Sequence, residues 1–354
     1  MKEGSNTMPH AQSPDQVARR QARGDAIRTF LDEFAPGENQ DLLAEMMVTI
    51  CRLAQDNASR GDVKVLNQAV KELRYAYKVF APYEHIQKCT IFGSARTRED
   101  HPQYLQCVKF AQLIQQQGWM VITGAGDGIM RAGHHGATRE ASFGVAISLP
   151  FEQSTNAIIE GDPKCVNFKY FFTRKLMFLK EAEAIILFPG GFGTQDEGFE
   201  SLTLIQTGKS VPVPVILVDE PGGTYWQHWR TYVQSELLRT GMIGQDDMSL
   251  FSITDDAQEA VDEIMHFYRR YHSSRFVNEE FVIRMKSSLP AEMLDKLNDD
   301  YESLLNGGDI RQVDSALPEE AGEFADLPRL VFSYDKKSAG RLRQMINDIN
   351  DYGA

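Results

Sequence analysis

The residues of this chain that could perform chemistry gather where predicted strands give way to predicted helices. Residues 188–200 read FPGGFGTQDEGFE, with three glycines in four positions, followed by a threonine and three acids. Glycines at a strand-to-helix turn allow a phosphate to approach the free N–H groups of the helix. Because carboxylates repel phosphate, the stretch predicts a ligand that has a phosphate at one end and requires an acid at the other.

An arginine and a glutamate are expected to flank this turn. Residues 168–182 and 193–208 predict two helices. The first carries Arg174 and Lys175 near its beginning, and the second carries Glu197. Both helices begin at the carboxyl ends of the predicted strands, where open parallel sheets bind their ligands. Arg174 and Glu197 are therefore expected to face one crevice.

Each of these charged residues also has a purely structural interpretation. Residues 194–197 read TQDE, a capping box in which Glu197 would only cap its helix. Arg174 and Lys175 could be a solvated pair, although cations at a helix beginning oppose its dipole and so favour a nearby anion. The residue pattern alone leaves the helix cap and the catalytic acid open as alternatives.

Two further glycine turns follow predicted strands. Gly93 and Ser94 end the strand KCTIFG, and residues 124–128, GAGDG, follow the strand WMVIT. A dinucleotide fingerprint is rejected, because the glycine-rich turns lie in later strand–helix units than the first and no acid stands about 20 residues after Gly124. Three glycine turns at one sheet edge favour a nucleotide-sized ligand instead.

The elements around these turns predict an α/β fold. Short apolar strands alternate with amphipathic helices over about 86–255, which predicts a doubly wound, Rossmann-like parallel sheet. Residues 21–85 are helical in pattern. Residues 256–354 form a helical extension that is expected to end in a late strand and helix. Residues 1–20 are polar and are expected to be a disordered tail. Residues 305–328 are expected to be a linker or an irregular loop.

The composition argues against several classes of protein. Lys and Arg number 37 and Asp and Glu number 50, so the formal net charge is −13, which disfavours a nucleic-acid partner. No apolar run approaches the roughly 20 residues that span a bilayer, and the N-terminus has no apolar signal core. The four cysteines are widely spaced, and the eight histidines show no metal-ligand spacing. We therefore expect a cytoplasmic protein with no metal and no other cofactor.

Two motifs of the chain resemble a known family. PGGFGTQDE, residues 189–197, matches the pattern P-G-G-x-G-T-x-x-E, and FFTRK carries an Arg-Lys pair whose arginine lies 23 residues before the glutamate. Together they resemble the Lonely Guy family, once mislabelled lysine decarboxylases, whose motif the bacterial nucleotide 5′-monophosphate nucleosidases share. The resemblance runs from about Cys89 to Ile253.

The resemblance implies a reaction and the residues that carry it. Characterised members are phosphoribohydrolases, which hydrolyse the N-glycosidic bond of nucleoside 5′-monophosphates, including cytokinin ribotides, to free base and ribose 5-phosphate. The essential pair of the family matches Arg174 and Glu197. Its ligand-contacting positions match Lys175, Gly190, Gly191, Gly193, Thr194 and Thr203.

This chain departs from the plant members at two places. Phe171 and Phe172 stand where those enzymes have Met-His, and Asn156 stands where they have a glutamate. These departures put a cytokinin preference in doubt and favour the bacterial branch. Met130, Phe171 and Phe172 could pack against the base or belong to the core.

The expected roles follow from the transition state of the reaction. When the ribosyl C–N bond breaks, positive charge develops on the sugar. A carboxylate near the anomeric carbon stabilises this charge and can position or deprotonate water. We assign this role to Glu197, while Arg174 would hold the ligand and orient the glutamate. Glu200 would bind ribose hydroxyls or be an exposed helix acid. The other predicted substrate-binding residues are Gly93, Ser94, Gly124, Gly126, Gly128, Met130 and Asn156.

Two other functions remain open. The protein could bind a nucleotide without cleaving it, as a non-catalytic sensor or carrier. Lys175 could instead hold pyridoxal phosphate in a decarboxylase, although no fingerprint of that cofactor is present. The expected partners are a nucleoside 5′-monophosphate substrate and further copies of the chain, in a homodimer or larger homo-oligomer. Neither a nucleic acid nor a membrane is expected as a partner.

Overall fold

The chain divides into two compact units after Lys71. The computed structural model describes residues 14–148, 155–320 and 322–352. Of the disordered tail expected over 1–20, residues 1–13 lie outside the described residues, and the first helix already begins at Pro14.

The first unit is helical. It contains α1 (Pro14–Phe34) and α2 (Gln40–Gln55), which pack against each other, and the beginning of α3 (Arg60–Phe80). Helix α2 buries none of its side chains, so its stability cannot come from a core of its own.

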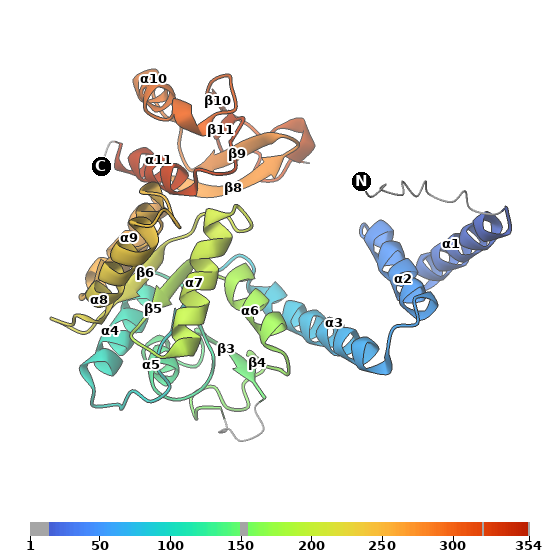
Figure 1. The fold of residues 1–354 in the computed structure, drawn as a ribbon, viewed down its shortest axis with the longest axis horizontal. Coiled ribbons are helices and arrows are strands. Elements are labelled where there is room, and N and C mark those ends of the chain that lie inside the picture. The colour runs from blue at the N-terminus through green and yellow to red at the C-terminus, as the bar shows by residue number, and fades with distance from the viewer. Residues whose placement is uncertain (1–13, 149–154, 321, 353–354) are drawn as a thin grey trace, which may run out of the picture. The chain divides into compact units, whose positions relative to one another are not determined.

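Seven parallel strands form the first sheet of the second unit, in the order β4-β3-β2-β1-β5-β6-β7 (Figure 1). The strands are β1 (Lys88–Phe92), β2 (Met120–Thr123), β3 (Ser142–Ile147), β4 (Cys165–Phe168), β5 (Ala184–Leu187), β6 (Val215–Val218) and β7 (Ser252–Thr254). Thr90 of β1 lies opposite Ile122 of β2 and Ile185 of β5. This sheet confirms the predicted doubly wound α/β fold. The sequence-based assignment missed β4 and β7, which are short edge strands with half-exposed residues.

Helices cover both faces of this sheet, because successive residues of a strand point to opposite faces. Ala184 and Ile186 of β5 belong to one hydrophobic cluster, and Ile185 and Leu187 belong to another. The first cluster includes residues of α4 (Pro102–Gln116), α5 (Ile129–Ala137) and α9 (Ala257–Phe267). The second includes residues of the last turns of α3, of α6 (Phe171–Lys180), of α7 (Phe192–Gln206) and of α8 (Tyr225–Tyr232).

The C-terminal region differs from the predicted helical extension, because it contains a four-stranded antiparallel sheet in the order β10-β11-β9-β8. Its elements are β8 (Tyr271–Val277), β9 (Glu280–Met285), α10 (Ala291–Asp300), β10 (Arg311–Val313), β11 (Arg329–Phe332) and α11 (Ala339–Asp351). Asn278, at φ 55°, turns the β8–β9 hairpin. The sequence YHSSRFV of β8 is too polar to predict a strand by its apolar residues.

None of the helices in the described residues is long and apolar enough to cross a bilayer.

Candidate active site

A cavity of about 820 Å³ opens at the carboxyl ends of the parallel strands. Strands β1 and β5 are neighbours there although a long stretch of chain separates them, and such a switch in strand order is where open α/β sheets bind ligands. The volume suits a small-molecule ligand. Ten predicted site residues line this cavity: Gly93, Ser94, Gly124, Met130, Arg174, Gly190, Gly191, Gly193, Thr194 and Glu197.

Backbone hydrogen bonds at Ser94 join the three glycine turns. The Ser94 N–H donates to the Pro189 carbonyl at 3.1 Å, and the Ser94 carbonyl accepts from the Ile129 N–H at 3.0 Å. Gly128 has φ +61°, and a Cβ there would collide with the Ser94 carbonyl. A Cβ on Gly190 would collide with the side chain of Thr194. Glycine is therefore required at both positions, by packing between two turns at Gly128 and by packing within the third turn at Gly190.

The beginning of α7 offers backbone N–H groups to the cavity. The helix begins at Phe192 with Gly191 as its N-cap. Because glycine has no side chain, the N-cap leaves the first N–H groups of the helix uncapped. Gln195 makes the first helical hydrogen bond, to the Gly191 carbonyl at 3.1 Å. The N–H groups of Phe192, Gly193 and Thr194 precede that bond, and such groups favour an anion. Space is open beside Gly191 and Gly193, where a Cβ would meet no atom within 4 Å.

Glu197 is a buried carboxyl in the wall of the cavity, with only 8% of its surface exposed. The capping-box interpretation is wrong, because α7 begins two residues before Thr194. Oε2 of Glu197 accepts no hydrogen bond from the described residues, and it forms an ion pair with Lys175 at 4.0 Å. Burial raises the pKa of Glu197 to about 7, against the opposing charges of Lys175 and Arg174. A buried carboxyl with a pKa near neutrality is suited to proton transfer.

Arg174 lies in the first turn of α6, and its guanidinium is held against the second glycine turn. Nε donates to the Val145 carbonyl at 2.9 Å, and the guanidinium lies over the Phe178 ring at 5.1 Å. A Cβ on Gly124 would collide with Nη2 of the arginine, so Gly124 makes room for this side chain. Arg174 lowers the pKa of Glu197, which is consistent with one shared site.

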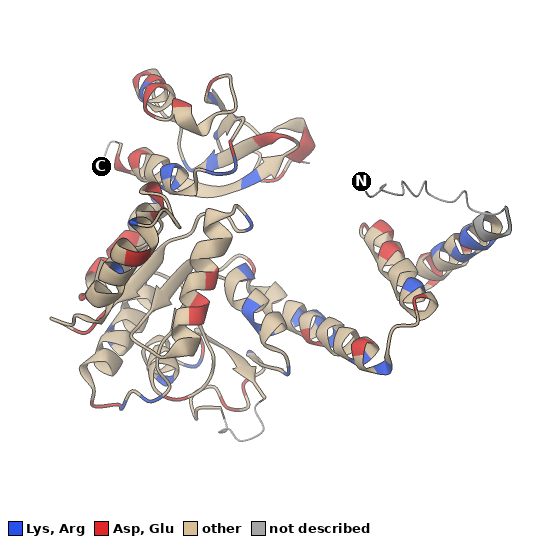
Figure 2. Cartoon of the chain, viewed as in Figure 1, with Lys and Arg blue, Asp and Glu red and all other residues tan. Residues whose placement is uncertain are grey.

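Lys175 is held by acids of α7 and does not line the cavity. Its Nζ contacts the carboxylates of Asp196, at 2.6 Å, and of Glu200. Figure 2 shows these two helices with basic positions on α6 and acidic positions on α7. Burial lowers the pKa of Lys175, but the hydrogen bonds to Asp196 and Glu200 outweigh burial and raise it. The amine stays protonated, which opposes the Schiff-base role of a decarboxylase.

A buried acid from α3 holds the beginning of α6. Glu72 is 5% exposed, and its carboxylate accepts the N–H of Lys169 at 2.8 Å and the hydroxyl of Thr173 at 2.6 Å. The N-cap Tyr170 makes no side-chain cap of its own. A carboxylate at this end offsets the cations of the first turn, including Arg174. Sequence reasoning missed Glu72, because nothing local connects it to a helix about a hundred residues later.

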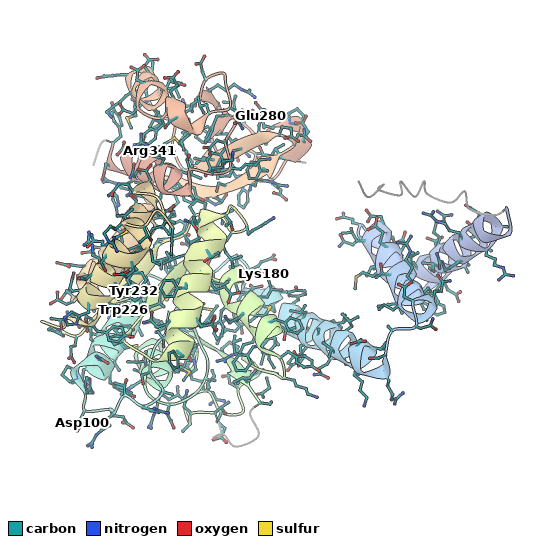
Figure 3. The ribbon with its side chains drawn as sticks, in the orientation of Figure 1. Asp100, Lys180, Trp226, Tyr232, Glu280 and Arg341 are labelled. Carbon is teal, nitrogen blue, oxygen red and sulfur yellow. The ribbon has the colours of Figure 1, made fainter. Side chains whose placement is uncertain are left out.

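Tyr225 at the beginning of α8 supports the glycine turn before α7. Its hydroxyl donates to the Gly190 carbonyl at 2.6 Å and accepts from Nε2 of Gln195 at 2.7 Å. The next residue, Trp226, labelled in Figure 3, anchors α8 by donating to the Val218 carbonyl at 3.2 Å. The cavity-lining residues that sequence reasoning missed are Phe92, Ala95, Arg96, Phe192, Gln195, Asp196 and Tyr225.

Six predicted site residues do not line the cavity: Gly126, Gly128, Asn156, Lys175, Glu200 and Thr203. Asn156 supports the second glycine turn, where its Nδ2 donates to the carbonyls of Ala125 at 3.1 Å and Gly126 at 2.9 Å. The Thr203 hydroxyl donates to the Phe199 carbonyl of its own helix at 2.7 Å. Asn156 therefore shapes the site from behind, and Thr203 lies along the helix away from it.

The histidines and acids do not form a metal site within the described ranges. No group of three or more His, Cys, Asp or Glu side chains in 14–148, 155–320 and 322–352 is placed to hold a metal ion. His134 is buried, with its Nε2 at 2.9 Å from the Thr123 hydroxyl and at 3.1 Å from the Phe143 carbonyl. Burial lowers its pKa to about 4, so this histidine is neutral and structural.

One family model matches part of the chain. Residues 125–264 match the family model described as "Possible lysine decarboxylase". Among curated proteins, nothing matches the chain.

Solved structures are similar to about half of the chain. The molybdenum cofactor carrier protein from Chlamydomonas reinhardtii has 18% identity and a TM-score of 0.36, with 51% of this chain and 96% of that chain covered. The molybdenum cofactor binding protein from Rippkaea orientalis has 17% identity and a TM-score of 0.34, with 51% and 94% covered. DNA processing protein A from Helicobacter pylori has 12% identity and a TM-score of 0.32, with 51% and 80% covered.

Proposed function

Since the chain contains a domain of the family described as possible lysine decarboxylases, which is the family that its motifs resemble, we propose that it is a phosphoribohydrolase. It hydrolyses the N-glycosidic bond of nucleoside 5′-monophosphates to free base and ribose 5-phosphate. The observation that carries the proposal is Glu197, a buried carboxyl in the cavity wall whose Oε2 has no hydrogen-bond partner among the described residues.

The phosphate of the substrate binds at the beginning of α7. The N–H groups of Phe192, Gly193 and Thr194 and the positive end of the helix dipole favour an anion there. The open space beside Gly191 and Gly193 lets phosphate oxygens approach the backbone. Because Glu197 lies in the second turn of the same helix, the ribose between them brings its anomeric carbon toward the carboxylate.

Glu197 acts on the bond between ribose and base. As this bond breaks, its electron pair goes to the base and positive charge develops on the sugar, which the carboxylate stabilises. Water adds to the anomeric carbon, and its proton passes to Glu197, whose pKa of about 7 suits a general base. The protonated Glu197 then gives this proton to the departing base, directly or through water, which releases the neutral base and restores the carboxylate. The positive charge of Arg174 favours the deprotonated form of the Glu197 carboxylate. Phe171 and Met130 in the cavity wall can pack against the base.

We further propose that the protein is a homo-oligomer. Helix α2 exposes Leu42, Met46 and Ile50, and α3 exposes Val63 and Leu66. Adjacent exposed apolar side chains are unusual on a soluble monomer and are commonly covered in an assembly. Sedimentation equilibrium measures the mass in solution, and a monomer at micromolar concentration overturns this part of the proposal.

The reaction is tested by separate incubations of the purified protein with AMP, GMP, CMP, UMP and IMP. Free base is followed by chromatography, and the matching nucleosides serve as controls. Release of base from monophosphates but not from nucleosides supports the proposal and ranks the bases. Bound nucleotides without any release of base overturn it in favour of a non-catalytic sensor or carrier.

A further inference from the structure

Two hollows meet at the loop that follows β1. The cavity of the candidate active site and an adjoining pocket of about 500 Å³ share Ala95 and Arg96 in their walls. The adjoining pocket is also lined by Tyr104 of α4, by Asp127 of the second glycine turn and by Arg131 of α5. The loop with Arg96 therefore separates the two hollows, and its side chain borders both.

The arginines around this loop differ in how they are neutralised. Arg98 pairs with Asp100, labelled in Figure 3, at 3.1 Å, and Arg131 pairs with Glu99 at 2.7 Å. Arg96 is exposed, and it takes part in no ion pair with the described residues. Of these three cations, Arg96 is the one whose charge is available to a ligand.

The acids of the loop lie on the far side of Arg96. Glu99, Asp100 and Asp127 line the adjoining pocket and do not line the candidate active site. On the cavity side the acids are Asp196 and Glu197 of α7. Asp196 is already paired with Lys175, and Glu197 is partly protonated at neutral pH because its pKa is about 7. An anion next to Arg96 is therefore favoured on the cavity side of the loop.

Hydrogen bonds fix the backbone of Arg96 beside the turn that precedes α7. The Arg96 N–H donates to the Ser94 hydroxyl at 3.1 Å, and the Ser94 N–H donates to the Pro189 carbonyl at 3.1 Å. Arg174 is the other arginine of the cavity wall, but its Nε is already bonded to Val145. Of these two arginines, Arg96 is the one whose side chain makes no hydrogen bond or ion pair with the described residues.

We propose that Arg96 binds the phosphate of the ligand and makes the site selective for phosphorylated compounds. A guanidinium presents paired N–H donors that match two phosphate oxygens, and it supplies a full charge that backbone N–H groups lack. The inference rests on the phosphate position of the proposed function but not on hydrolysis. The ligand class is therefore any compound with a terminal sugar phosphate, whether or not its glycosidic bond is cleaved.

Titration calorimetry with Arg96→Ala tests this role, and Arg98→Ala is the matched control in the same loop. The probes are AMP and ribose 5-phosphate, with adenosine as the ligand that lacks the phosphate. Arg96→Ala should weaken both phosphorylated ligands about 10-fold to 100-fold, the usual effect of losing a charged hydrogen bond. It should leave adenosine unchanged, and Arg98→Ala should change every affinity by less than about 2-fold. Arg96→Lys should restore part of the affinity, because lysine returns the positive charge but not the paired N–H donors of the guanidinium.

The possible outcomes separate this inference from the proposed reaction. If Arg96→Ala binds AMP as tightly as the wild type, or weakens adenosine equally, Arg96 does not recognise phosphate. If the wild type binds neither AMP nor ribose 5-phosphate, the inference is also wrong. If phosphorylated ligands bind through Arg96 but no monophosphate releases base, the phosphate role stands and the phosphoribohydrolase proposal fails.

Discussion

Two buried glutamates in the second unit show how partners decide what a carboxyl can do. Glu197 in α7 is 8% exposed and Glu320, between β10 and β11, is 2% exposed. Oε2 of Glu197 accepts no hydrogen bond from any described residue. In Glu320 both oxygens accept hydrogen bonds. The two residues have the same side chain and similar burial, but opposite hydrogen-bonding states.

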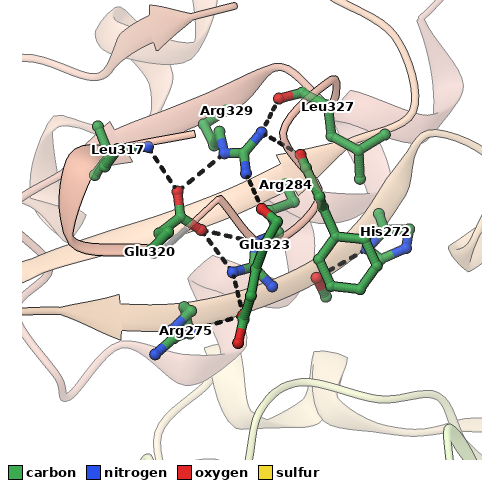
Figure 4. Close-up of polar contacts among 10 residues, drawn as sticks. His272, Arg275, Arg284, Leu317, Glu320, Glu323, Leu327 and Arg329 are labelled. Carbon is green, nitrogen blue, oxygen red and sulfur yellow. Dashed lines mark hydrogen bonds and ion pairs between the residues drawn. The ribbon is translucent and has the colours of Figure 1, made fainter. Parts of the chain in front are cut away.

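Glu320 is part of a closed ionic network (Figure 4). Its Oε1 accepts from Arg284 at 2.8 and 2.6 Å, and its Oε2 accepts from Arg329 at 3.1 Å and from the Leu317 N–H at 3.0 Å. Burial raises the pKa of Glu320, but these bonds and charges outweigh burial and lower it. At Glu197 burial raises the pKa by more than the neighbouring cations lower it. Full pairing therefore fixes a charge for structure, while incomplete pairing leaves a carboxyl whose protonation can change during a reaction.

The largest effect on stability is expected from Glu320→Ala. The variant should lose about 3–5 kcal/mol of unfolding free energy, because Arg329 stays buried without a counter-charge and Arg284 keeps only the half-exposed Glu323. Urea denaturation measures the loss. Glu323→Ala is the matched control, since Glu323 pairs with Arg284 and Arg275 but is 55% exposed, and it should cost less than about 1 kcal/mol. Equal losses in the two variants contradict the comparison.

Glu197→Gln should reduce activity without reducing stability, the reverse of what Glu320→Ala does. Turnover of nucleoside monophosphates should fall at least ~100-fold, because the amide cannot accept a proton or stabilise positive charge on the sugar. The unfolding free energy should stay the same or rise, because the variant no longer buries a charge that lacks a hydrogen bond. Glu236→Gln, the same substitution at an exposed carboxylate that does not line the cavity, serves as the control for activity. Unchanged turnover in Glu197→Gln would show that this residue has no part in the chemistry.

The contributions of the two glutamates to stability should depend on pH in opposite directions. The folded-state pKa of Glu197 is raised from 4.5 to about 7, so its contribution to stability is present below 4.5 and is lost as the pH rises through 7. Glu320 has a lowered pKa, so its contribution is present above 4.5 and is lost as the pH falls through its folded value. Unfolding free energies of the wild type and Glu197→Gln should diverge as the pH rises from 4.5 to 7.

Catalysis should follow the deprotonated form of Glu197. The kcat/KM for a monophosphate should rise with pH and level off above about 7. A decrease through the same range would instead assign the residue as a general acid.

A smaller effect is expected from another buried glutamate, Glu72, which acts through α6. Glu72→Ala should lower kcat about 10-fold by loosening the helix that carries Arg174. Thr173→Val removes one of its partners, whereas Thr173→Ser keeps the hydroxyl and should behave as the wild type. Stopped assays and thermal melts on the same samples distinguish positioning from unfolding. If kcat changes only in proportion to the folded fraction, Glu72 is purely structural.

Much of the candidate site could be predicted because its signals are local. Apolar runs predicted β1, β2 and β5, and glycines marked the turns after them. Because parallel strands end at one edge, two helix beginnings that carry Arg174 and Glu197 were expected to converge there. The family model matches residues 125–264, which include both motifs of the resemblance, and the doubly wound sheet is confirmed.

The capping box is where the local signal misled. As a capping box, TQDE would make Thr194 the N-cap of its helix, but α7 begins at Phe192 with Gly191 as the N-cap. This difference moves Glu197 from the helix end into its second turn. There it is buried and Oε2 lacks a hydrogen-bond partner among the described residues, a state that depends on what packs around it.

The sequence by itself determined the periodic elements, the glycine turns and the pair of charged residues that face one crevice, because each depends on neighbours within a few positions. Tertiary structure alone decided which groups meet across long stretches of chain. It placed Glu72 under α6, Tyr225 behind the glycine turn and Arg96 between two hollows. It also gave Glu320, in a stretch predicted to be irregular, a buried network. Such contacts carry no local pattern, because their energy arises only when distant segments remove the same groups from water.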